Sequence, residues 1–471
     1  MINSKSFKVE SLTYTVFFLC PFFIVAGPIF KNIFVILVFS LSIYCYIKNN
    51  YKFSLLNYEI IFLIFLIYLL VTNLVIFNVH GIVKVFYLSI FFFVLVCFRY
   101  IKPKFILSRK HIKIYLSLFF ILIIDAFIQY YFGKNLLGYE LADGNRVSGI
   151  FNDEAILGSF FSKFLILLIS FFLIEKRKFS FLLLSVFLTS FVIIIFLSGE
   201  RSAFILSIIL LLTYFIYIKK YKYLLSFLSF ILIFNIILFN TNYLKEYKKK
   251  YLTYIGDLGI SKSISEKYST QQLIDSEHKK YIFSENFNYL SEVEIAKNLG
   301  ITVQKVQDLK VNNSIKYDSF LNTYHGGLFA RAIVLSKQNL LFGHGIKKYR
   351  IICSKAEGSQ NKNFNSNFVY KKNIYKYYCS THPHNIYLEL LVETGLIGLT
   401  LFIVFIFLFL LKLKNKKFNY LEKSVILTNF ALFFPFLPTG SFFSSQYFIY
   451  FFFFIIFATN YLNIDEYNKS L

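Results

Sequence analysis

The sequence predicts an all-α polytopic membrane protein with about 12 transmembrane helices and one large, mainly helical loop domain. Two observations lead to this fold class. Hydrophobic residues make up 57% of the chain, charged residues only 16%, and the mean hydropathy is +0.60. Soluble globular proteins are about 45–50% apolar and about 25% charged, so a soluble chain of this composition would lack the polar groups to cover its surface. The apolar residues also gather in long runs.

These apolar runs approach the length that a membrane-spanning helix requires, about 20 residues. The first run has no small-residue cleavage site after it, so we expect a retained span and not a signal peptide. The eleventh is short and contains Pro435, with Pro438 just after it, which favours a kinked or re-entrant segment. The predicted spans lie at about 11–29, 30–47, 58–78, 82–101, 112–132, 155–174, 179–198, 202–218, 223–240, 387–411, 424–437 and 446–462.

One long polar segment, residues 241–386, separates the ninth and tenth predicted spans. It begins with a lysine-rich stretch and is rich in asparagine, serine and lysine. Long loops without structure are uncommon in proteins, so this length favours a folded domain outside the membrane. The chain is therefore expected to divide into residues 1–240 with nine helices, the loop domain 241–386, and residues 387–471 with three helices.

The formal net charge of +25 comes from 50 basic and 25 acidic residues. On a soluble chain this excess would indicate nucleic-acid binding, but here it follows the predicted topology. With the N-terminus inside, the short cytoplasmic segments hold 22 Lys and Arg residues, and the short loops on the opposite side hold five. The positive-inside rule then places both termini in the cytoplasm and residues 241–386 outside it. We expect membrane lipids, and no nucleic acid, among the partners.

Residues 291–310 look like a DNA-binding helix-turn-helix, with Ala296, Gly300 and Val306 at the expected spacing. The physical content of this pattern is two short amphipathic helices joined by a turn that contains glycine. Because the predicted topology puts the segment on the non-cytoplasmic side, away from DNA, we expect a structural helical hairpin. A helical contact with a substrate or a partner is the alternative.

Two of the five cysteines, Cys353 and Cys379, fall in the predicted external loop, and the other three lie in apolar spans. An oxidising compartment permits a disulfide between the two loop cysteines. Two free thiols are the alternative, and the sequence alone does not separate these states.

Three arginines on the non-cytoplasmic side are candidate binding residues. Arg146 lies in a turn between the fifth and sixth spans, and Arg201 lies in the very short connection between the seventh and eighth. An arginine costs about 2.5–3.5 kcal/mol at the centre of a membrane helix and less near an interface, so such residues usually pair with a charge or bind an anion. Arg331 lies in a predicted amphipathic helix that is followed by a Gly-x-Gly turn at 343–345. An anchoring, ion-pair or surface role is the alternative for each arginine.

The segment that leads into the tenth span contains His384, Gly395 and Gly398. On one continuous helix, at about 100° per residue, both glycines would share the face of His384. They would open a notch there, where another helix or a lipid chain approaches closely. Glu389 and Glu393 would point to other faces, so neither is an obvious partner of the histidine on the same helix.

A zinc site formed by His382 and His384 is a competing interpretation of this segment. Structural and catalytic zinc sites need at least three protein ligands, and no third residue has a helpful spacing. We therefore expect neither a metal nor another cofactor.

The pattern His384-Asn385, nine residues, Gly395, two residues, Gly398 resembles the signature of the O-antigen ligase and O-antigen polymerase superfamily. The mid-chain Gly-Glu-Arg-Ser turn, the large late loop and the arginine-led helix before a Gly-x-Gly turn also resemble this family. The resemblance is strongest over residues 195–215 and 325–400. The chain departs from it at Ile205, where the ligases often have leucine, and in the segment 291–310.

The resemblance implies glycosyl transfer at the periplasmic face of the bacterial inner membrane. Such enzymes take a glycan from an undecaprenyl-pyrophosphate-linked donor and pass it to an acceptor sugar, without a required metal. Carried over to the matching positions, His384 would be the catalytic histidine. Arg201 and Arg331 would hold the donor pyrophosphate, and Arg146 matches this role more loosely.

The acceptor separates two readings of the resemblance. Lipid A–core as acceptor would make the protein a ligase, and a second lipid-linked glycan would make it a polymerase. We favour the ligase, because the single C-terminal block of arginine helix, Gly-x-Gly turn and His-Asn pair resembles ligases slightly more. A polysaccharide transporter or flippase is a third interpretation, although no convincing internal repeat is visible and few ionisable residues lie in mid-span.

Overall fold

The computed structural model describes residues 4–49, 51, 54–101, 109–142, 146–174, 181–240, 324–358, 367–370, 373–376, 378–413, 420–435 and 439–462. The chain forms two compact units. The larger, called here the helical unit, contains Met1–Ile237, Leu328–Ser366 and Cys379–Leu471. The smaller contains Leu238–Gly327 and Asn367–Tyr378. The helix-turn-helix-like segment 291–310 lies outside the described residues.

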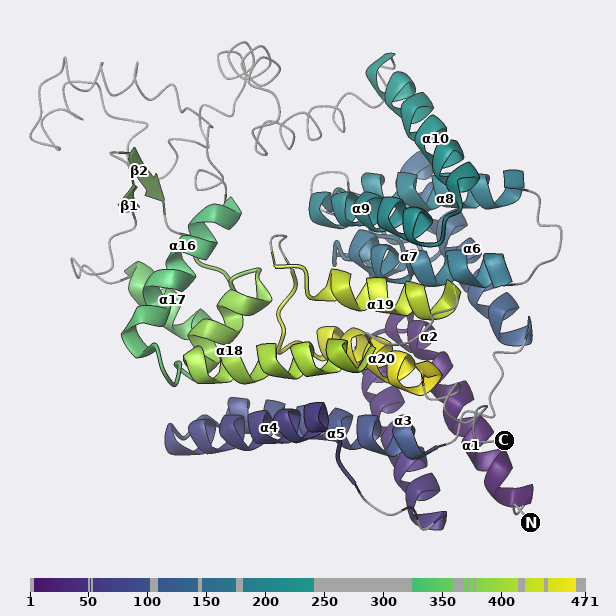
Figure 1. The fold of residues 1–471 in the computed structure, drawn as a ribbon. Helices are drawn as coiled ribbons and strands as arrows, with labels where there is room; N and C mark the ends of the chain where they lie inside the picture. Colours follow the sequence, from purple (N-terminus) through teal and green to yellow (C-terminus); the bar gives the residue numbers. More distant parts are fainter. Residues whose placement is uncertain are drawn as a thin grey trace, which may run out of the picture. The chain divides into compact units, whose positions relative to one another are not determined.

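The helices follow the apolar runs of the sequence, because each run stops where polar or helix-breaking residues begin. Figure 1 shows their arrangement, coloured along the chain. The helices are α1 (Ser4–Phe18), α2 (Cys20–Val25), α3 (Pro28–Lys48), α4 (Asn57–Val75), α5 (Val79–Tyr100), α6 (Arg109–Phe132), α7 (Leu157–Ile174), α8 (Phe181–Leu197), α9 (Arg201–Tyr217), α10 (Tyr221–Asn240), α16 (Tyr324–Ser336), α17 (Tyr349–Gly358), α18 (Ile386–Leu413), α19 (Tyr420–Leu432) and α20 (Ser445–Leu462), with the short 3-10 turns η1 (Gly149–Phe151) and η4 (Lys337–Asn339).

Three details differ from the sequence prediction. The first expected span is divided into α1 and α2, and Pro21 lies in the first turn of α2, where its missing N–H is tolerated. The eleventh is shorter than expected, because α19 ends at Leu432, before Pro435. The smaller unit contains two antiparallel strands, β1 (Asn367–Tyr370) and β2 (Asn373–Lys376), which is a small exception to an all-α fold.

Five of the described helices are long and apolar enough to cross a membrane: Pro28–Lys48, Asn57–Val75, Val79–Tyr100, His111–Phe132 and Ile386–Lys412. Four shorter apolar helices of 10–17 residues accompany them: Leu157–Leu173, Leu184–Leu197, Arg201–Tyr217 and Ser445–Thr459. Large apolar side chains such as Val71 of α4 and Phe86 of α5 are exposed on these helices, which suits contact with lipid. The protein is therefore a helical membrane protein, and the total of twelve spans stays a prediction.

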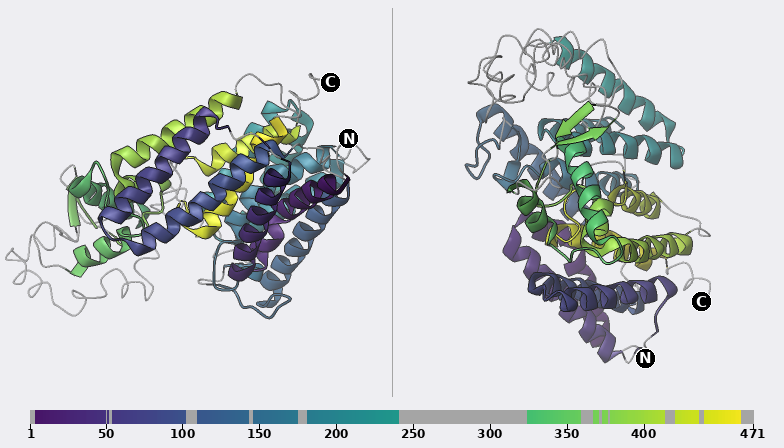
Figure 2. Two further views of the ribbon diagram at one scale, coloured as in Figure 1. Left: turned by 90° about the horizontal axis from the view of Figure 1, so that it is seen from below. Right: turned by 90° about the vertical axis from the view of Figure 1, so that its left-hand side faces the viewer.

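Helix α18 runs along α4, as both Figure 1 and Figure 2 show. Phenylalanine rings fill the space between these helices and their neighbours α5 and α20. The ring centroids of Phe62 and Phe405 are 4.7 Å apart, and those of Phe91 and Phe452 are 4.8 Å apart. Aromatic pairs at such distances stabilise a core beyond the burial of their surface. The apolar core thus fixes α18, which begins two residues after His384.

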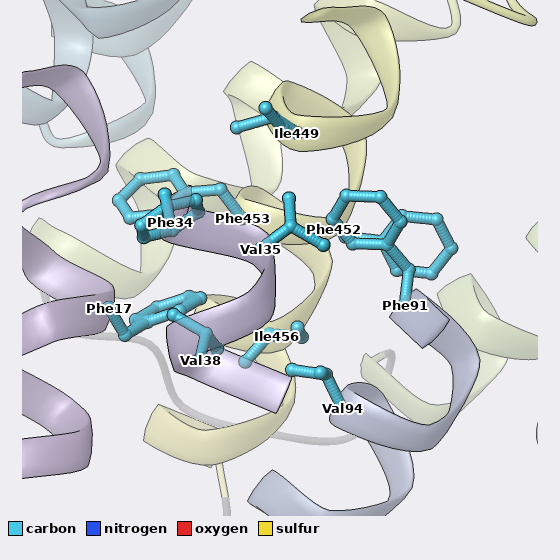
Figure 3. A pocket seen from close by; sticks show the side chains of 10 residues that line it. All are labelled: Phe17, Phe34, Val35, Val38, Phe91, Val94, Ile449, Phe452, Phe453 and Ile456. Atoms are coloured by element: carbon cyan, nitrogen blue, oxygen red, sulfur yellow. The ribbon is translucent and has the colours of Figure 1, made fainter. Parts of the chain in front are cut away.

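A pocket lies among α1, α3, α5 and α20, and Figure 3 shows the 10 side chains that line it. All of them are phenylalanine, valine or isoleucine. This lining offers no polar group that could bind a sugar or a pyrophosphate. The pocket is therefore a gap between packed helices and not a candidate functional site.

Candidate functional site

His384 lies in a tight turn immediately before α18. Its φ is 55°, in the left-handed region, and its carbonyl oxygen accepts a hydrogen bond from the Thr439 N–H at 2.7 Å. The side chain of the next residue, Asn385, caps the helix: Oδ1 accepts hydrogen bonds from the N–H groups of Tyr387 and Leu388 at 3.0 and 3.1 Å. The turn therefore fixes both the start of α18 and the position from which the imidazole projects.

The His384 imidazole is half-buried beside polar neighbours. Its Nε2 lies 3.3 Å from the Ser380 Oγ, and its ring centroid lies 4.1 Å from that of His382. Burial, and secondarily the charge of His382, lower the pKa of His384 to about 4. The imidazole is therefore neutral at neutral pH and able to accept a proton.

The zinc interpretation requires further ligands beside His382 and His384. His382 Nδ1 lies 3.0 Å from the Thr381 Oγ1. Within the part of the chain that the structure describes, His, Cys, Asp and Glu side chains form no group of three or more that is suited to a metal ion.

Helix α18 is interrupted at Gly395, whose φ of 68° and ψ of −173° are far from helical values. The segment before α17 fills the interruption with backbone hydrogen bonds. The N–H groups of 344–345 donate to the carbonyls of 392–393 at 2.9 and 2.8 Å. The N–H groups of 396–397 donate to the carbonyls of 340–341 at 2.8 and 3.3 Å. The Gly-x-Gly turn and Gly395 are thus two halves of one interlocked structure.

The expectation that Gly395 and Gly398 share a helix face with His384 is wrong, because the helix is not continuous between these residues. A Cβ atom on Gly395 would lie 2.2 Å from the Leu341 carbonyl oxygen. One on Gly398 would lie 2.3 Å from the Thr394 Oγ1 and 3.0 Å from the Tyr68 ring. Both glycines therefore permit close packing, but the neighbours are the 340–343 segment for Gly395, and the Thr394 side chain and α4 for Gly398.

Two acidic residues of α18, set aside in the sequence analysis, are buried close to this turn, with Glu389 0% and Glu393 2% exposed. Glu389 accepts hydrogen bonds from the Ser441 Oγ and the Phe442 N–H, both at 2.6 Å. Glu393 accepts one from the Lys347 N–H at 2.7 Å. Acidic residues within an apolar span are rare and usually functional, and that rarity was the signal available in the sequence.

The second group of candidate residues lies at the turn between α8 and α9, where Gly199 has a φ of 69°. The Arg146 Nε donates to the Ser198 carbonyl at 2.9 Å, and a Cβ atom on Gly199 would lie 2.9 Å from the same nitrogen. Arg201 is the first residue of α9, and its side chain is exposed. The structure therefore brings Arg146 against the turn that carries Arg201.

Polar side chains of α6 hold the loop that carries Arg146. Gln129 Oε1 accepts hydrogen bonds from the N–H groups of Ser148 and Gly149 at 2.9 and 2.7 Å. Asp125 Oδ1 accepts one from the Leu136 N–H at 2.9 Å. Because both side chains are buried in an otherwise apolar helix, their partners determine where the loop sits.

The Glu200 carboxylate of the same turn caps α7, since its Oε1 accepts a hydrogen bond from the Ser159 N–H at 3.1 Å. Burial raises the pKa of Glu200 above its ordinary value, although the Ser159 N–H and the charges of Lys163 and Arg146 act against this. The turn thus combines one half-buried carboxylate with nearby cations, an arrangement that can hold positive charge at a defined position.

Arg331 lies in α16 and is 1% exposed, the largest side chain that is fully buried among the described residues. The residue that follows it belongs to a small core between α16, α17 and α18. That core consists of Ala332, Leu335, Tyr349, Cys353 and Val392. Arg331 is therefore fixed by an element that packs directly on the first part of α18.

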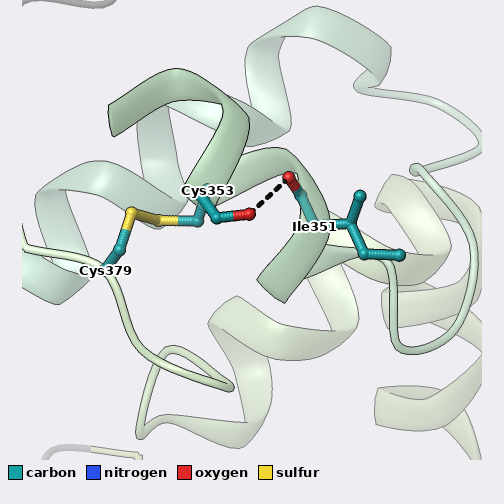
Figure 4. The surroundings of a disulfide bond; sticks show 4 residues. Ile351, Cys353 and Cys379 are labelled. Carbon is teal, nitrogen blue, oxygen red and sulfur yellow. Dashed lines mark hydrogen bonds between the residues drawn. A yellow bond between two sulfur atoms is a disulfide. The ribbon is translucent and has the colours of Figure 1, made fainter. Parts of the chain in front are cut away.

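Cys353 and Cys379 form a disulfide, with Cα atoms 5.7 Å apart (Figure 4). Cys353 lies in α17 two residues after Ile351, whose carbonyl accepts a hydrogen bond from the Ser354 Oγ at 3.0 Å. Cys379 immediately precedes Ser380 and the histidine turn. The disulfide therefore links α17 to the irregular segment that leads into His384.

The predicted site residues thus form two groups within the helical unit. His384 and Arg331 belong to the part built by α16–α18, and Arg146 and Arg201 belong to the part built by α6–α9. Helix α20 and the connection before it touch both groups. The Asn385 Nδ2 donates to the Pro435 carbonyl at 2.7 Å, and the Lys163 Nζ lies 4.6 Å from the Tyr450 ring centroid.

Comparison with known proteins finds one family model that matches part of the chain. Residues 184–403 match the family model described as O-antigen ligase. This range includes Arg201, Arg331, His384 and both glycines of α18, and it leaves out Arg146. A search of curated proteins gives no match. The broken α18, the interlocked Gly-x-Gly turn and the histidine turn all lie inside the matched range, so this part of the chain is similar to the O-antigen ligase family.

Proposed function

We propose that the protein is a glycosyltransferase of the bacterial inner membrane, which transfers an undecaprenyl-pyrophosphate-linked glycan to lipid A–core on the periplasmic side. The observation that carries the proposal is His384, a neutral imidazole beside a serine hydroxyl, within the range that matches the O-antigen ligase family. An O-antigen polymerase, which joins lipid-linked repeat units, is the alternative that uses the same chemistry on a different acceptor.

In the proposed reaction, the oxygen of an acceptor hydroxyl attacks the anomeric carbon of the donor glycan. A carbon–oxygen bond forms there, and the bond from that carbon to the pyrophosphate breaks, so undecaprenyl pyrophosphate leaves with the electron pair. His384 takes the proton of the hydroxyl as general base. A single displacement of this kind inverts the anomeric carbon.

The pKa of His384, about 4, describes the protein without its donor. A bound pyrophosphate brings negative charge near the imidazole, which favours the protonated form and raises this pKa towards neutrality. Donor binding would therefore turn a weak base into one better matched to neutral pH, at the step where a proton has to be taken.

The departing pyrophosphate requires positive charge, and the proposal assigns this to arginines. Arg201 begins α9, so the free N–H groups and the dipole of that helix add to its charge. Arg331 is buried, and a guanidinium stays charged in such surroundings and binds phosphate oxygens through two N–H groups. Arg146 is the third candidate, and its bond to the Ser198 carbonyl also supports the turn before Arg201.

The periplasmic side of the reaction rests on the distribution of charge. The basic residues of the short loops favour a cytoplasmic N-terminus and C-terminus, which would put the histidine turn on the opposite side. The Cys353–Cys379 disulfide supports the same orientation, because disulfides persist in the periplasm and are rare in the cytoplasm.

The proposal is tested with purified full-length protein in nanodiscs. The protein is incubated with an undecaprenyl-pyrophosphate-linked glycan and either lipid A–core or a second lipid-linked glycan. We expect glycan on lipid A–core, and transfer lowered by about 1,000-fold in a His384→Ala variant that is equally well folded. Polymer on the lipid carrier would identify the alternative function.

Proteoliposomes distinguish the enzyme from a transporter. We expect transfer to acceptor on one side of the bilayer without movement of the donor across it. Movement of the donor without any transfer would overturn the proposal and favour a flippase.

A further inference from the structure

The connection between α19 and α20 is held against the start of α18 at several points. The Asn385 Nδ2 donates to the Pro435 carbonyl at 2.7 Å, and the Tyr387 hydroxyl donates to the Phe433 carbonyl at 2.6 Å. The third point is Glu389, one helical turn after Asn385. Every second residue at the start of α18 thus contacts this connection.

Glu389 makes the strongest of these attachments, because it is a fully buried carboxylate with both oxygens engaged. Its Oε1 accepts from the Ser441 Oγ and its Oε2 from the Phe442 N–H. The Lys347 Nζ donates to the Ser441 Oγ at 2.5 Å and lies 3.8 Å from the Glu389 Oε1. Removing one partner of a buried charged network leaves the other uncompensated, so these contacts resist displacement.

The connection between α19 and α20 also contacts His384 directly. Thr439, two residues before Ser441, donates its N–H to the His384 carbonyl oxygen at 2.7 Å. His384 has a positive φ, which a residue with a side chain adopts only when the surrounding structure holds it there. The direction in which the imidazole projects therefore depends on where Thr439 sits, and Glu389 holds the chain two residues farther on.

We infer that Glu389 is a positioning residue for His384, acting through Ser441 and Lys347 on the connection between α19 and α20. The inference deepens the proposed function and rests on it, since it concerns the placement of the proposed base. A role in general stability alone is the alternative, because Asn385 and Tyr387 also attach the connection to α18.

Three variants of the full-length protein separate these roles. We expect Glu389→Ala to lower kcat by about 100-fold with little change in the KM for the donor, since a misplacement of about 1 Å costs a reaction this much. Ser441→Ala removes one of the two hydrogen bonds and should lower kcat by about tenfold. Glu389→Gln keeps an oxygen for the Phe442 N–H and should recover much of the activity lost in Glu389→Ala.

Glu59→Ala is the matched control. Glu59 is also fully buried and also pairs with a cation, the Arg99 Nε at 3.0 Å, but it lies in α4 beside Tyr58, which packs on Phe405 and Phe409 near the far end of α18. If Glu389 acts only through stability, both alanine variants lose activity in proportion to their lowered Tm. If it positions His384, only Glu389→Ala loses kcat beyond that proportion.

A second measurement does not depend on transfer. Diethyl pyrocarbonate modifies neutral imidazoles, and mass spectrometry gives the rate for His384 alone. We expect this rate to change by about threefold or more in Glu389→Ala and to stay at the wild-type value in Glu59→Ala. An unchanged rate in both, or a wild-type kcat in Glu389→Ala, would overturn the inference. Absence of transfer by the wild-type protein, with the expected change in rate, would instead contradict the proposed function.

Discussion

The start of α18 and the turn between α8 and α9 are built in similar ways. Each has a residue in the left-handed region, His384 or Gly199, at the end of an apolar helix or just before one. Each also has a carboxylate close by, fully buried in Glu389 and half-buried in Glu200. Glu389 accepts from Ser441 and Phe442, whereas Glu200 accepts from the first turn of α7.

The two regions differ in what these carboxylates hold. Glu389 binds a separate connection of the chain, which in turn donates a hydrogen bond to the backbone carbonyl of His384. Glu200 lies within the electrostatic reach of Lys163 and Arg146, in a turn that ends at Arg201. Under the proposed function, similar turns in one bundle would serve proton transfer in one place and the stabilisation of negative charge in another.

The largest expected effect comes from Gly395→Ala, which would destroy the first region and leave the second intact. The new Cβ would lie 2.2 Å from the Leu341 oxygen, and alanine is strained at a φ of 68°. We expect the free energy of unfolding to fall by about 3 kcal/mol or more, from backbone strain and lost backbone hydrogen bonds. Thermal unfolding of the purified protein measures this change.

Two other glycines serve as graded controls for that prediction. Gly133 also has a positive φ, 77°, but a Cβ there would meet nothing within 4 Å, so Gly133→Ala should cost only about 1–2 kcal/mol. Gly440 has neither constraint, and Gly440→Ala should leave the Tm unchanged. Equal losses of unfolding free energy at Gly395 and Gly133 would show that the contacts of Gly395 with the 340–345 segment do not stabilise the fold.

A smaller effect, confined to activity, is expected at the second region. Arg201 is exposed, so Arg201→Ala should leave the Tm unchanged while lowering kcat/KM by about 100-fold, the cost of removing one donor to a developing negative charge. Arg201→Lys keeps the charge but not the paired N–H groups and should lose about tenfold. Steady-state kinetics with varied donor measures both, and a wild-type kcat/KM in Arg201→Ala would remove this arginine from the site.

The smallest effect concerns Glu200. Because burial raises its pKa, the folded protein binds this proton more strongly than the unfolded chain, so its contribution to stability falls as pH rises from the ordinary value through the raised one. Glu200→Gln carries no such proton, and its Tm should depend less steeply on pH above the ordinary glutamate pKa of about 4.3. Parallel Tm profiles for the two proteins would mean that Glu200 titrates as an ordinary carboxyl.

Much of the helical architecture was predictable, because long apolar runs set the bounds of most helices to within a few residues. The structure of α18 was not. A helical wheel assumes one continuous helix, and Gly395 breaks that assumption with partners at 340–345, about fifty residues away in sequence. Both glycines were recognised as sites of close approach, but the segment that approaches is fixed by tertiary contacts.

The polar residues of the site show the same limit. Arg201 was predictable because an arginine this close to an apolar span is costly and usually pairs with a charge or binds an anion. His384 was predictable from its spacing to Gly395 and Gly398, which resembles the family signature. Glu389 and Glu393 were equally rare in their span but were set aside, because their partners were sought on the same helix. Those partners, Ser441 and Lys347, come from segments on either side of α18 in the sequence.

The role of His384 is tested by the pH dependence of kcat/KM for the wild-type protein and for His384→Ala. If His384 is the base, the wild-type value is nearly constant around neutral pH and falls as the imidazole is protonated, with a pKa of about 4. Removal of the side chain should then lower transfer by about 1,000-fold and abolish the acid limb. An alanine variant that is folded and transfers glycan at the wild-type rate, with the same acid limb, would contradict this role.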